Sequence, residues 1–219
     1  IGSSREIRFE DMKNHHRVLI GAVLLALVLA LLGCRGDGGP PPDTAPDQAP
    51  PVRLVDAQTR YPLGAHLAYL EDPTGALTLA DVTAPPYSRQ FTPSRDPYPD
   101  FGLTQSAYWI RVTLRSERDQ PTDWLLEVGS PYLDAVDIYV PDAGGEIRHV
   151  VMGDRLPFHA REFPHRHFLL DLPLSPHADP TLYLRLQDQS RIRVAMTLWE
   201  PDAFARAQAL WTLGYGIFY

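Results

Sequence analysis

The feature that most constrains this chain is a two-residue alternation of apolar and polar side chains in several short segments. In residues 107–115 (AYWIRVTLR) every second side chain from Tyr108 to Leu114 is large and apolar. Residues 135–140, 181–187 and 193–199 repeat the pattern. A period of two is typical of half-buried antiparallel strands, because successive side chains point to opposite faces of the sheet. These segments therefore predict an all-β domain.

Further strand candidates are separated by turn sequences. The turns are residues 72–75 (DPTG) and 142–145 (DAGG), and the second one predicts a β-hairpin because it lies between two strand candidates. Eight or nine short strands at this spacing predict a jelly-roll-like antiparallel β-sandwich over residues 52–200, without a long amphipathic helix. The additional strand candidates are residues 65–70, 124–128, 147–152 and 167–172.

The front of the chain carries a targeting signal. Residues 18–32 are almost unbroken in their apolar character and follow Lys13 and Arg17. Such a run is short for a membrane-spanning helix, which needs about twenty residues, and it suits the hydrophobic region of a signal peptide. We therefore expect a lipoprotein-type signal peptide over residues 12–33, preceded by a non-native upstream segment at residues 1–11.

The end of this signal predicts lipidation. Residues 31–34 (LLGC) resemble a bacterial lipobox, in which the cysteine thiol is alkylated by diacylglycerol and the peptide is cut before that cysteine. We predict this modification for Cys34, the single cysteine, and several acyl chains would hold the chain firmly at a membrane. An uncleaved signal anchor is the alternative. Residues 34–51 are rich in Gly and Pro and predict a disordered tether.

The end of the chain changes character after the predicted sandwich. Pro201 and Asp202 suit the first turn of a helix, and no charged residue follows Arg206. We expect the start of a transmembrane helix in residues 201–219, with Trp211 at the membrane interface. The alternative is a terminal helix that packs on the sandwich.

Eight short stretches, taken in order, carry a resemblance to a known family. They are residues 69–75 (YLEDPTG), 101–112 (FGLTQSAYWIRV), 124–128 (WLLEV), 133–140 (LDAVDIYV), 153–158 (GDRLPF), 183–186 (YLRL), 198–201 (LWEP) and 213–217 (LGYGI). Together they resemble the type 2 extracellular domain of bacterial seven-transmembrane receptors with diverse intracellular signalling modules (7TMR-DISM). The last stretch looks like the beginning of that family's first membrane helix.

The resemblance implies a periplasmic, jelly-roll-like domain that binds carbohydrate or another small ligand. It also implies that ligand state passes to membrane helices and to a cytoplasmic output module absent from this chain. The domain would lie in the bacterial cell envelope, anchored to the inner membrane, with a second copy of the chain as a further expected partner. The lipobox departs from the plain signal peptide expected of this family.

Aromatic and arginine side chains gather on the side of the strands away from the aliphatic residues. Aromatic rings stack on the apolar faces of sugars, and a guanidinium donates two hydrogen bonds to a carboxylate or phosphate. The alternative is structural, with the tryptophan packed beneath a loop and the arginines paired with acids such as Asp137. The candidate ligand-binding residues are Trp109, Arg111, Tyr139, Tyr183, Arg185 and Arg193.

Other classes of function find little support. The formal net charge of −7 provides no electrostatic footprint for nucleic acid. No nucleophile elbow or phosphate-binding loop occurs, and His159, His165 and His167 lack a further spaced ligand for zinc. We therefore expect no catalysis, cofactor or metal. The alternative function is a protein docking or dimerisation module, which an apolar patch around Tyr139 and Trp199 would support.

Overall fold

The computed structural model describes residues 48–142 and 144–217. The predictions for residues 1–11 and 12–33, for Cys34 and for most of the tether therefore lie outside the described residues. Within the described part, the chain is predominantly antiparallel β-sheet with few helices, which confirms the all-β prediction.

The larger sheet has seven strands. Six follow the order β4-β3-β6-β11-β8-β9, in which neighbours are antiparallel, and β1 joins β6 in parallel. The predicted hairpin is confirmed, because β8 and β9 pair on either side of the turn that begins at Asp142. The strands are β1 (Val52–Leu54), β3 (Leu67–Asp72), β4 (Thr92–Pro93), β6 (Ala107–Ser116), β8 (Ala135–Pro141), β9 (Ile147–Met152) and β11 (Thr181–Gln187).

The second sheet has four strands in the order β10-β7-β13-β2, and a separate two-stranded sheet pairs β12 with β5. All of these pairs are antiparallel. The strands are β2 (Arg60–Pro62), β5 (Asp100–Leu103), β7 (Thr122–Val128), β10 (Phe168–Leu174), β12 (Arg191–Arg193) and β13 (Met196–Trp199). This strand order does not confirm a jelly roll.

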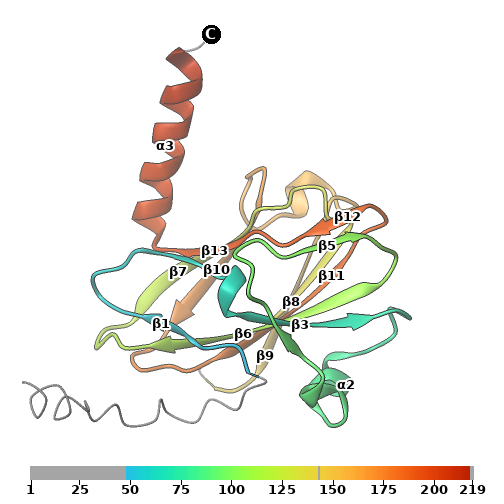
Figure 1. Ribbon diagram of the computed structural model, residues 1–219. Coiled ribbons are helices and arrows are strands. Elements are labelled where there is room, and N and C mark those ends of the chain that lie inside the picture. The colour runs from blue at the N-terminus through green and yellow to red at the C-terminus, as the bar shows by residue number, and fades with distance from the viewer. Residues whose placement is uncertain (1–47, 143, 218–219) are drawn as a thin grey trace, which may run out of the picture. The chain divides into compact units, whose positions relative to one another are not determined.

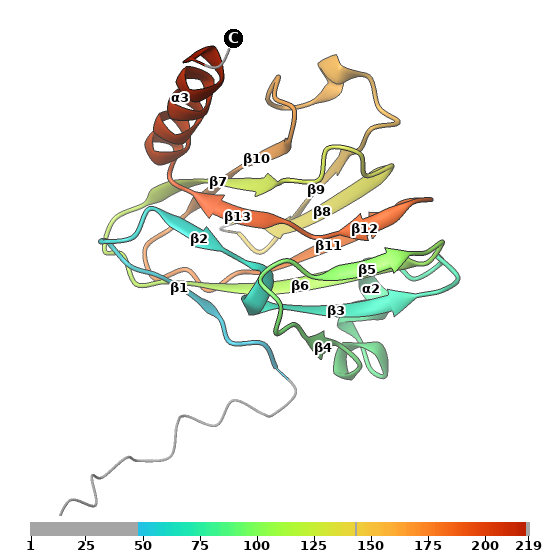
Figure 2. The ribbon, with the colours of Figure 1, turned by 45° about the horizontal axis from the view of Figure 1, so that its top comes forward.

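The two larger sheets form separate layers (Figures 1 and 2), and their inward side chains make one apolar core. Ile110 and Leu184 from the larger sheet and Leu126 and Leu198 from the smaller one are fully buried in it, as the alternation predicts. Burying each such side chain contributes about 1.5–3 kcal/mol to the free energy of unfolding. A lone cysteine cannot form an internal disulfide, so the domain depends on this core.

The strand predicted at residues 193–199 is wrong as one element. The structure divides it into β12 and β13, which belong to different sheets. Between them, the Val194 N–H donates to the Pro99 carbonyl and the Ala195 carbonyl accepts from Gly129. The chain thus changes hydrogen-bonding partners while the buried side chains keep their alternation.

The outer face of the seven-stranded sheet is partly covered by the segment between β3 and β4. This segment contains α2 (Leu79–Thr83) and η2 (Tyr87–Arg89), and in Figure 1 it lies on the side of the sheet away from β7, β10 and β13. Thr78 and Asp81 form a reciprocal capping box at the start of α2. Val82 and Phe91 bury a second, smaller apolar cluster against Trp109, which we call the outer cluster.

The remaining helices of the described residues are η1 (Gly64–His66), η3 (Phe158–Ala160) and α3 (Pro201–Ile217), and only Glu200 separates α3 from β13. The ring of Phe204, in the first turns of α3, contacts Trp199 and His165 at centroid distances of 5.9 and 5.4 Å. Among the helices of residues 48–142 and 144–217, none has the length and apolar character needed to cross a membrane.

Candidate functional site

Five of the six predicted site residues share the outer face of the seven-stranded sheet. Across β6 and β11, Arg111 lies opposite Tyr183 and Trp109 lies opposite Arg185. Tyr139 of β8 lies opposite Tyr183 on its other side. Opposed residues in antiparallel strands point to the same face, so the register gathers these side chains into one patch.

Trp109 packs inside this patch rather than standing at its surface. Its side chain is fully buried in the outer cluster, with Val82 and Phe91 as neighbours. Its ring stacks on Tyr139 with centroids 5.7 Å apart. In this conformation the indole supports the floor of the patch, because a fully buried ring offers no face to a solute.

Arg185 is held by the protein itself. Its guanidinium donates to the Gly75 carbonyl at 2.9 Å and to Gln187 Oε1 at 3.0 Å, and it lies 3.7 Å from Asp137. Gly75 has a φ of 66°, which favours glycine, so the turn that presents this carbonyl needs that residue. Arg185 therefore fastens the turn after β3 to the sheet.

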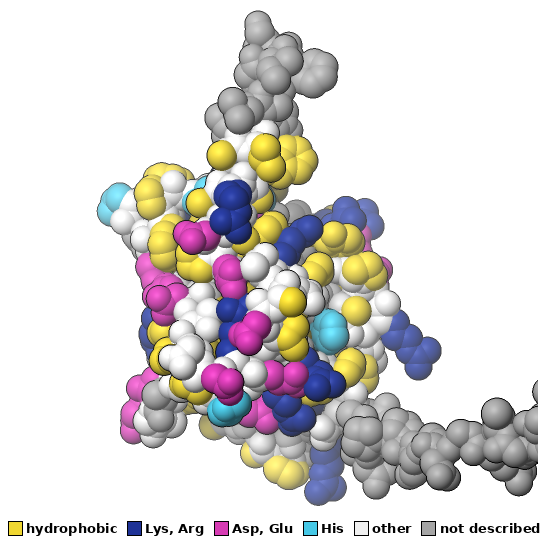
Figure 3. Space-filling view, turned by 90° about the vertical axis from the view of Figure 1, so that its left-hand side faces the viewer, with side chains coloured by type: hydrophobic (Ala, Val, Ile, Leu, Met, Phe, Trp, Pro, Cys, Tyr) yellow, Lys and Arg dark blue, Asp and Glu magenta, His cyan; other side chains and the backbone are white. Residues whose placement is uncertain are grey.

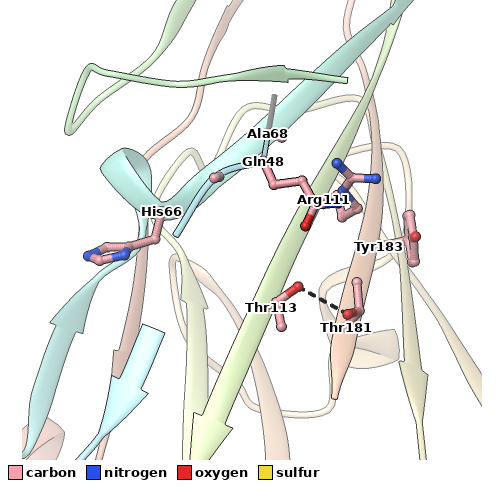
Figure 4. Close-up of a pocket in the computed structure, with 8 residues that line it drawn as sticks. Gln48, His66, Ala68, Arg111, Thr113, Thr181 and Tyr183 are labelled. Atoms are coloured by element: carbon pink, nitrogen blue, oxygen red, sulfur yellow. Dashed lines mark hydrogen bonds between the residues drawn. The ribbon is translucent and has the colours of Figure 1, made fainter. Parts of the chain in front are cut away.

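Arg111 borders an open recess, which Figure 4 shows in close-up. Its guanidinium donates to the Ser88 carbonyl at 3.1 Å and lies 4.5 Å from the centre of the Phe91 ring. Thr113 and Thr181 are hydrogen-bonded to each other at 3.1 Å on the recess wall. The recess has a volume of about 180 Å³.

The rest of the wall comes from residues that the sequence analysis did not single out as site candidates. The lining residues are Gln48, Ala49, His66, Ala68, Arg111, Thr113, Thr181 and Tyr183. The His66 ring nitrogen Nδ1 lies 3.2 Å from the Pro50 carbonyl, which holds the end of the tether beside the sheet. Thr113 and Thr181 point to the same outer face as Arg111, so the alternation of the strands could have identified them. No sequence signal places Gln48 there.

Tyr139 completes a row of stacked rings along the patch. It lies between Trp109 and His149, whose centroid is 4.3 Å away at an interplanar angle of 7°. His149 also contacts Asp137 at 2.9 Å. Burial, together with the charge of Asp137, raises the pKa of the Tyr139 hydroxyl, so it remains a neutral hydrogen-bonding group.

Arg193 lies elsewhere, because β12 pairs with β5 and not with the seven-stranded sheet. Its guanidinium is 5.9 Å from the Tyr98 ring centre, and its backbone carbonyl accepts from Ser130. The division of the predicted 193–199 strand explains the displacement. The structure thus brings together five of the six predicted residues, and two of them, Arg111 and Tyr183, line the recess.

In the described residues, Tyr139 and Trp199 do not share one apolar patch. Both side chains are half-buried, and they belong to different sheets. The face in Figure 3 mixes apolar, acidic and basic side chains.

The comparisons with known proteins agree with the resemblance seen in the sequence. A family model described as 7TMR-DISM extracellular 2 matches residues 64–200. A search of curated proteins gave no match. The matched residues contain most of the recess, since only Gln48 and Ala49 of its wall lie before them.

Proposed function

The chain belongs to the 7TMR-DISM extracellular 2 family, the extracellular sensing domains of membrane receptors, and we propose that its sandwich binds a sugar or sugar acid in the Arg111 recess. Membership supports the sensing role and a location outside the cytoplasmic membrane. The class of ligand rests on the chemistry of the recess.

The observation that carries this proposal is the position of the Arg111 guanidinium. A guanidinium has five N–H donors in a planar fork. Within the described residues its one hydrogen bond goes to Ser88, and the Phe91 ring supports it from one side. The remaining N–H donors lie in the plane of the guanidinium and point in fixed directions. This geometry suits a carboxylate or a pair of vicinal hydroxyls.

The other walls match a hydroxylated ligand. Thr113 and Thr181 each offer a hydroxyl that both donates and accepts, and Tyr183 adds an aromatic ring beside them. Sugars combine apolar ring faces with many hydroxyls, so they use both kinds of group. A second cavity, of about 230 Å³, lies at Pro121, Val140 and Leu172 and contains none of the predicted residues.

Attachment to the membrane belongs to the same proposal. Lipidation of Cys34 and a membrane helix that includes residues 201–219 would hold the sandwich at the bacterial inner membrane from both ends. Ligand binding would then shift the equilibrium between two positions of α3, or between its paired and unpaired states with a second protomer. That shift can be no larger than the difference in ligand affinity between the two states. The packing of the two sheets would be the physical route, because the recess lies on the seven-stranded sheet and α3 follows β13 of the four-stranded sheet.

A thermal-shift screen of the chain against sugars, sugar acids, cell-wall fragments and organic acids tests this proposal. A ligand of the native state raises the melting temperature in a saturable manner. The rise should disappear in Arg111→Ala and persist in Arg193→Ala, which removes an arginine outside the recess. Thr181→Val keeps the shape and should weaken binding up to about tenfold by removing one hydrogen bond.

Two results would contradict the proposal. A ligand whose effect survives Arg111→Ala binds elsewhere. If no compound shifts a folded chain, docking to another envelope protein becomes the better explanation of the domain.

A further inference from the structure

The outer face of the four-stranded sheet carries a half-buried polar cluster at the base of α3. The Glu127 carboxylate accepts hydrogen bonds from His167 Nδ1 at 2.6 Å and from Trp199 Nε1 at 2.8 Å. Burial alone would raise the pKa of Glu127, but these two hydrogen bonds and the nearby histidines outweigh it and lower that pKa. Glu127 is therefore an anion that fixes the ring of Trp199, the last residue of β13.

His165 connects this cluster to the helix. Its ring makes edge-to-face contacts with His167 and with Phe204 of α3, at centroid distances of 5.3 and 5.4 Å. Its Nδ1 atom accepts the backbone N–H of His167 at 3.0 Å. Phe204 also contacts Trp199, so the rings of His165 and Trp199 together hold the first turns of α3.

The direction of this hydrogen bond determines the protonation state. An imidazole nitrogen that accepts a hydrogen bond carries no proton, whereas an imidazolium donates from both nitrogens. A protonated His165 therefore cannot accept from His167, and its ring must turn away from that N–H. Because the same ring contacts Phe204, turning it also removes a contact that holds α3.

We propose that His165 is a proton-operated switch at the base of α3, holding the helix on the sandwich when neutral and releasing it when protonated. This adds proton sensing to the domain and does not depend on the Arg111 recess. The only chemical change is the addition of one proton to the Nδ1 atom of His165. The backbone N–H of His167 then donates its hydrogen bond to water or to another acceptor.

Charged groups lie on the elements that surround this ring. Glu127 of β7 is hydrogen-bonded to the neighbouring His167 ring. The cations in this region are Arg161, which donates to the His165 carbonyl, Arg166, and Arg60 of β2, whose guanidinium lies over the Trp199 ring. The charged residues at the start of α3 are the exposed Asp202 and Arg206. Glu200, just before the helix, is paired with Arg118. Histidine side chains in general change charge between about pH 5 and 8, which sets the two pH values for the test.

The test is a distance measurement between two spin labels on the 219-residue chain. One label replaces Arg206 on α3 and the other replaces Gln120 on the sandwich, both exposed, in a Cys34→Ser background. We expect a narrow distance distribution at pH 8 and a second, longer or broader component at pH 5. One proton is involved, so the ratio of released to held helix should rise up to about tenfold per pH unit below the midpoint.

The deciding comparison is the change between the two pH values. It should vanish in His165→Asn, whose side chain can accept a hydrogen bond but does not titrate, and persist in His159→Asn, an exposed histidine of the same loop. A label pair within the sandwich, at Gln120 and Glu146, should not respond, which excludes acid unfolding. An unchanged wild-type distribution, or a response that survives His165→Asn, overturns the proposal.

Discussion

At the scale of single residues, Asp72 shows how one carboxylate organises the turn after β3. Its side chain is 1% exposed, and it accepts hydrogen bonds from the Thr74 hydroxyl, the Gly75 N–H and the Leu77 N–H at 2.8 to 2.9 Å. Gly75 in turn presents the carbonyl that holds Arg185. A side chain that does not line the recess thus positions one of the predicted site residues.

Asp72→Asn should destabilise the chain by about 1–3 kcal/mol at pH 7, because at least one buried N–H loses its acceptor. Burial raises the pKa of Asp72, but the hydrogen bonds from Leu77, Thr74 and Gly75 lower it below the unfolded value of 3.8. The stabilisation is therefore complete above that pH and is lost as pH falls. Denaturant titrations at pH 7 and pH 3 should show the difference from wild type shrinking. Asp123→Asn, at an exposed carboxylate, should show little effect at either pH.

The sequence could predict which face each of these residues occupies but not what covers it. Alternation correctly grouped Arg111, Tyr139 and Tyr183 with Trp109, because a strand has only two faces. It could not show that Val82 and Phe91 would bury Trp109, since that cover comes from a segment between strands. Its capping box at Thr78 and Asp81 predicts a helix start but not the surface on which the helix lies.

At the scale of elements, the connection from β13 to α3 depends on a buried arginine. Arg118 is 8% exposed, lies 4.7 Å from the Trp124 ring centre and pairs with Glu200 at 2.6 Å. It also donates to the Val55 and Gln58 carbonyls, both at 3.0 Å. Glu200 precedes α3 directly, so this one guanidinium joins the β1–β2 connection to the residue from which the helix begins.

Arg118→Met should lower the free energy of unfolding by about 3–5 kcal/mol, because it keeps the apolar stem but leaves Glu200 and two carbonyls without their partner. The matched control is Arg115→Met, near the end of β6, whose ion pair with Asp179 is about half exposed on both sides. Such a pair contributes at most about 1 kcal/mol. Urea unfolding of both variants measures the difference, and equal losses would show that Arg118 is not a structural anchor.

The strand predicted at residues 193–199, which the structure divides into β12 and β13, lies just before this connection. Val194, Met196 and Leu198 are all buried, so the alternation passes through the break between β12 and β13 without interruption. A period of two reports which side of a strand is buried, not which strand lies beside it. The displacement of Arg193 from the site follows from that limit.

At the scale of the whole molecule, the seven-stranded sheet separates two apolar cores of unequal size. The inner core lies between the sheets, and the outer cluster lies beneath α2 and η2. The recess depends on the outer one, because Ser88 and Phe91 both contact Arg111. If the outer cluster opens on its own, the guanidinium loses its support while the sandwich stays folded.

We therefore expect a substitution in the outer cluster to destabilise only its own region, and a substitution in the inner core to destabilise the whole domain. Val82→Ala should speed hydrogen exchange of residues 78–91 by roughly tenfold or more, as expected from a loss of about 1–3 kcal/mol of local burial, and leave β11 protected. Ile138→Ala removes a fully buried side chain of the inner core and should cost about 2–5 kcal/mol globally, with faster exchange in both regions. Peptide-resolved exchange distinguishes these outcomes. Faster exchange of β11 in Val82→Ala would mean that the cover and the sandwich unfold together, and the recess could then open only when the whole domain does.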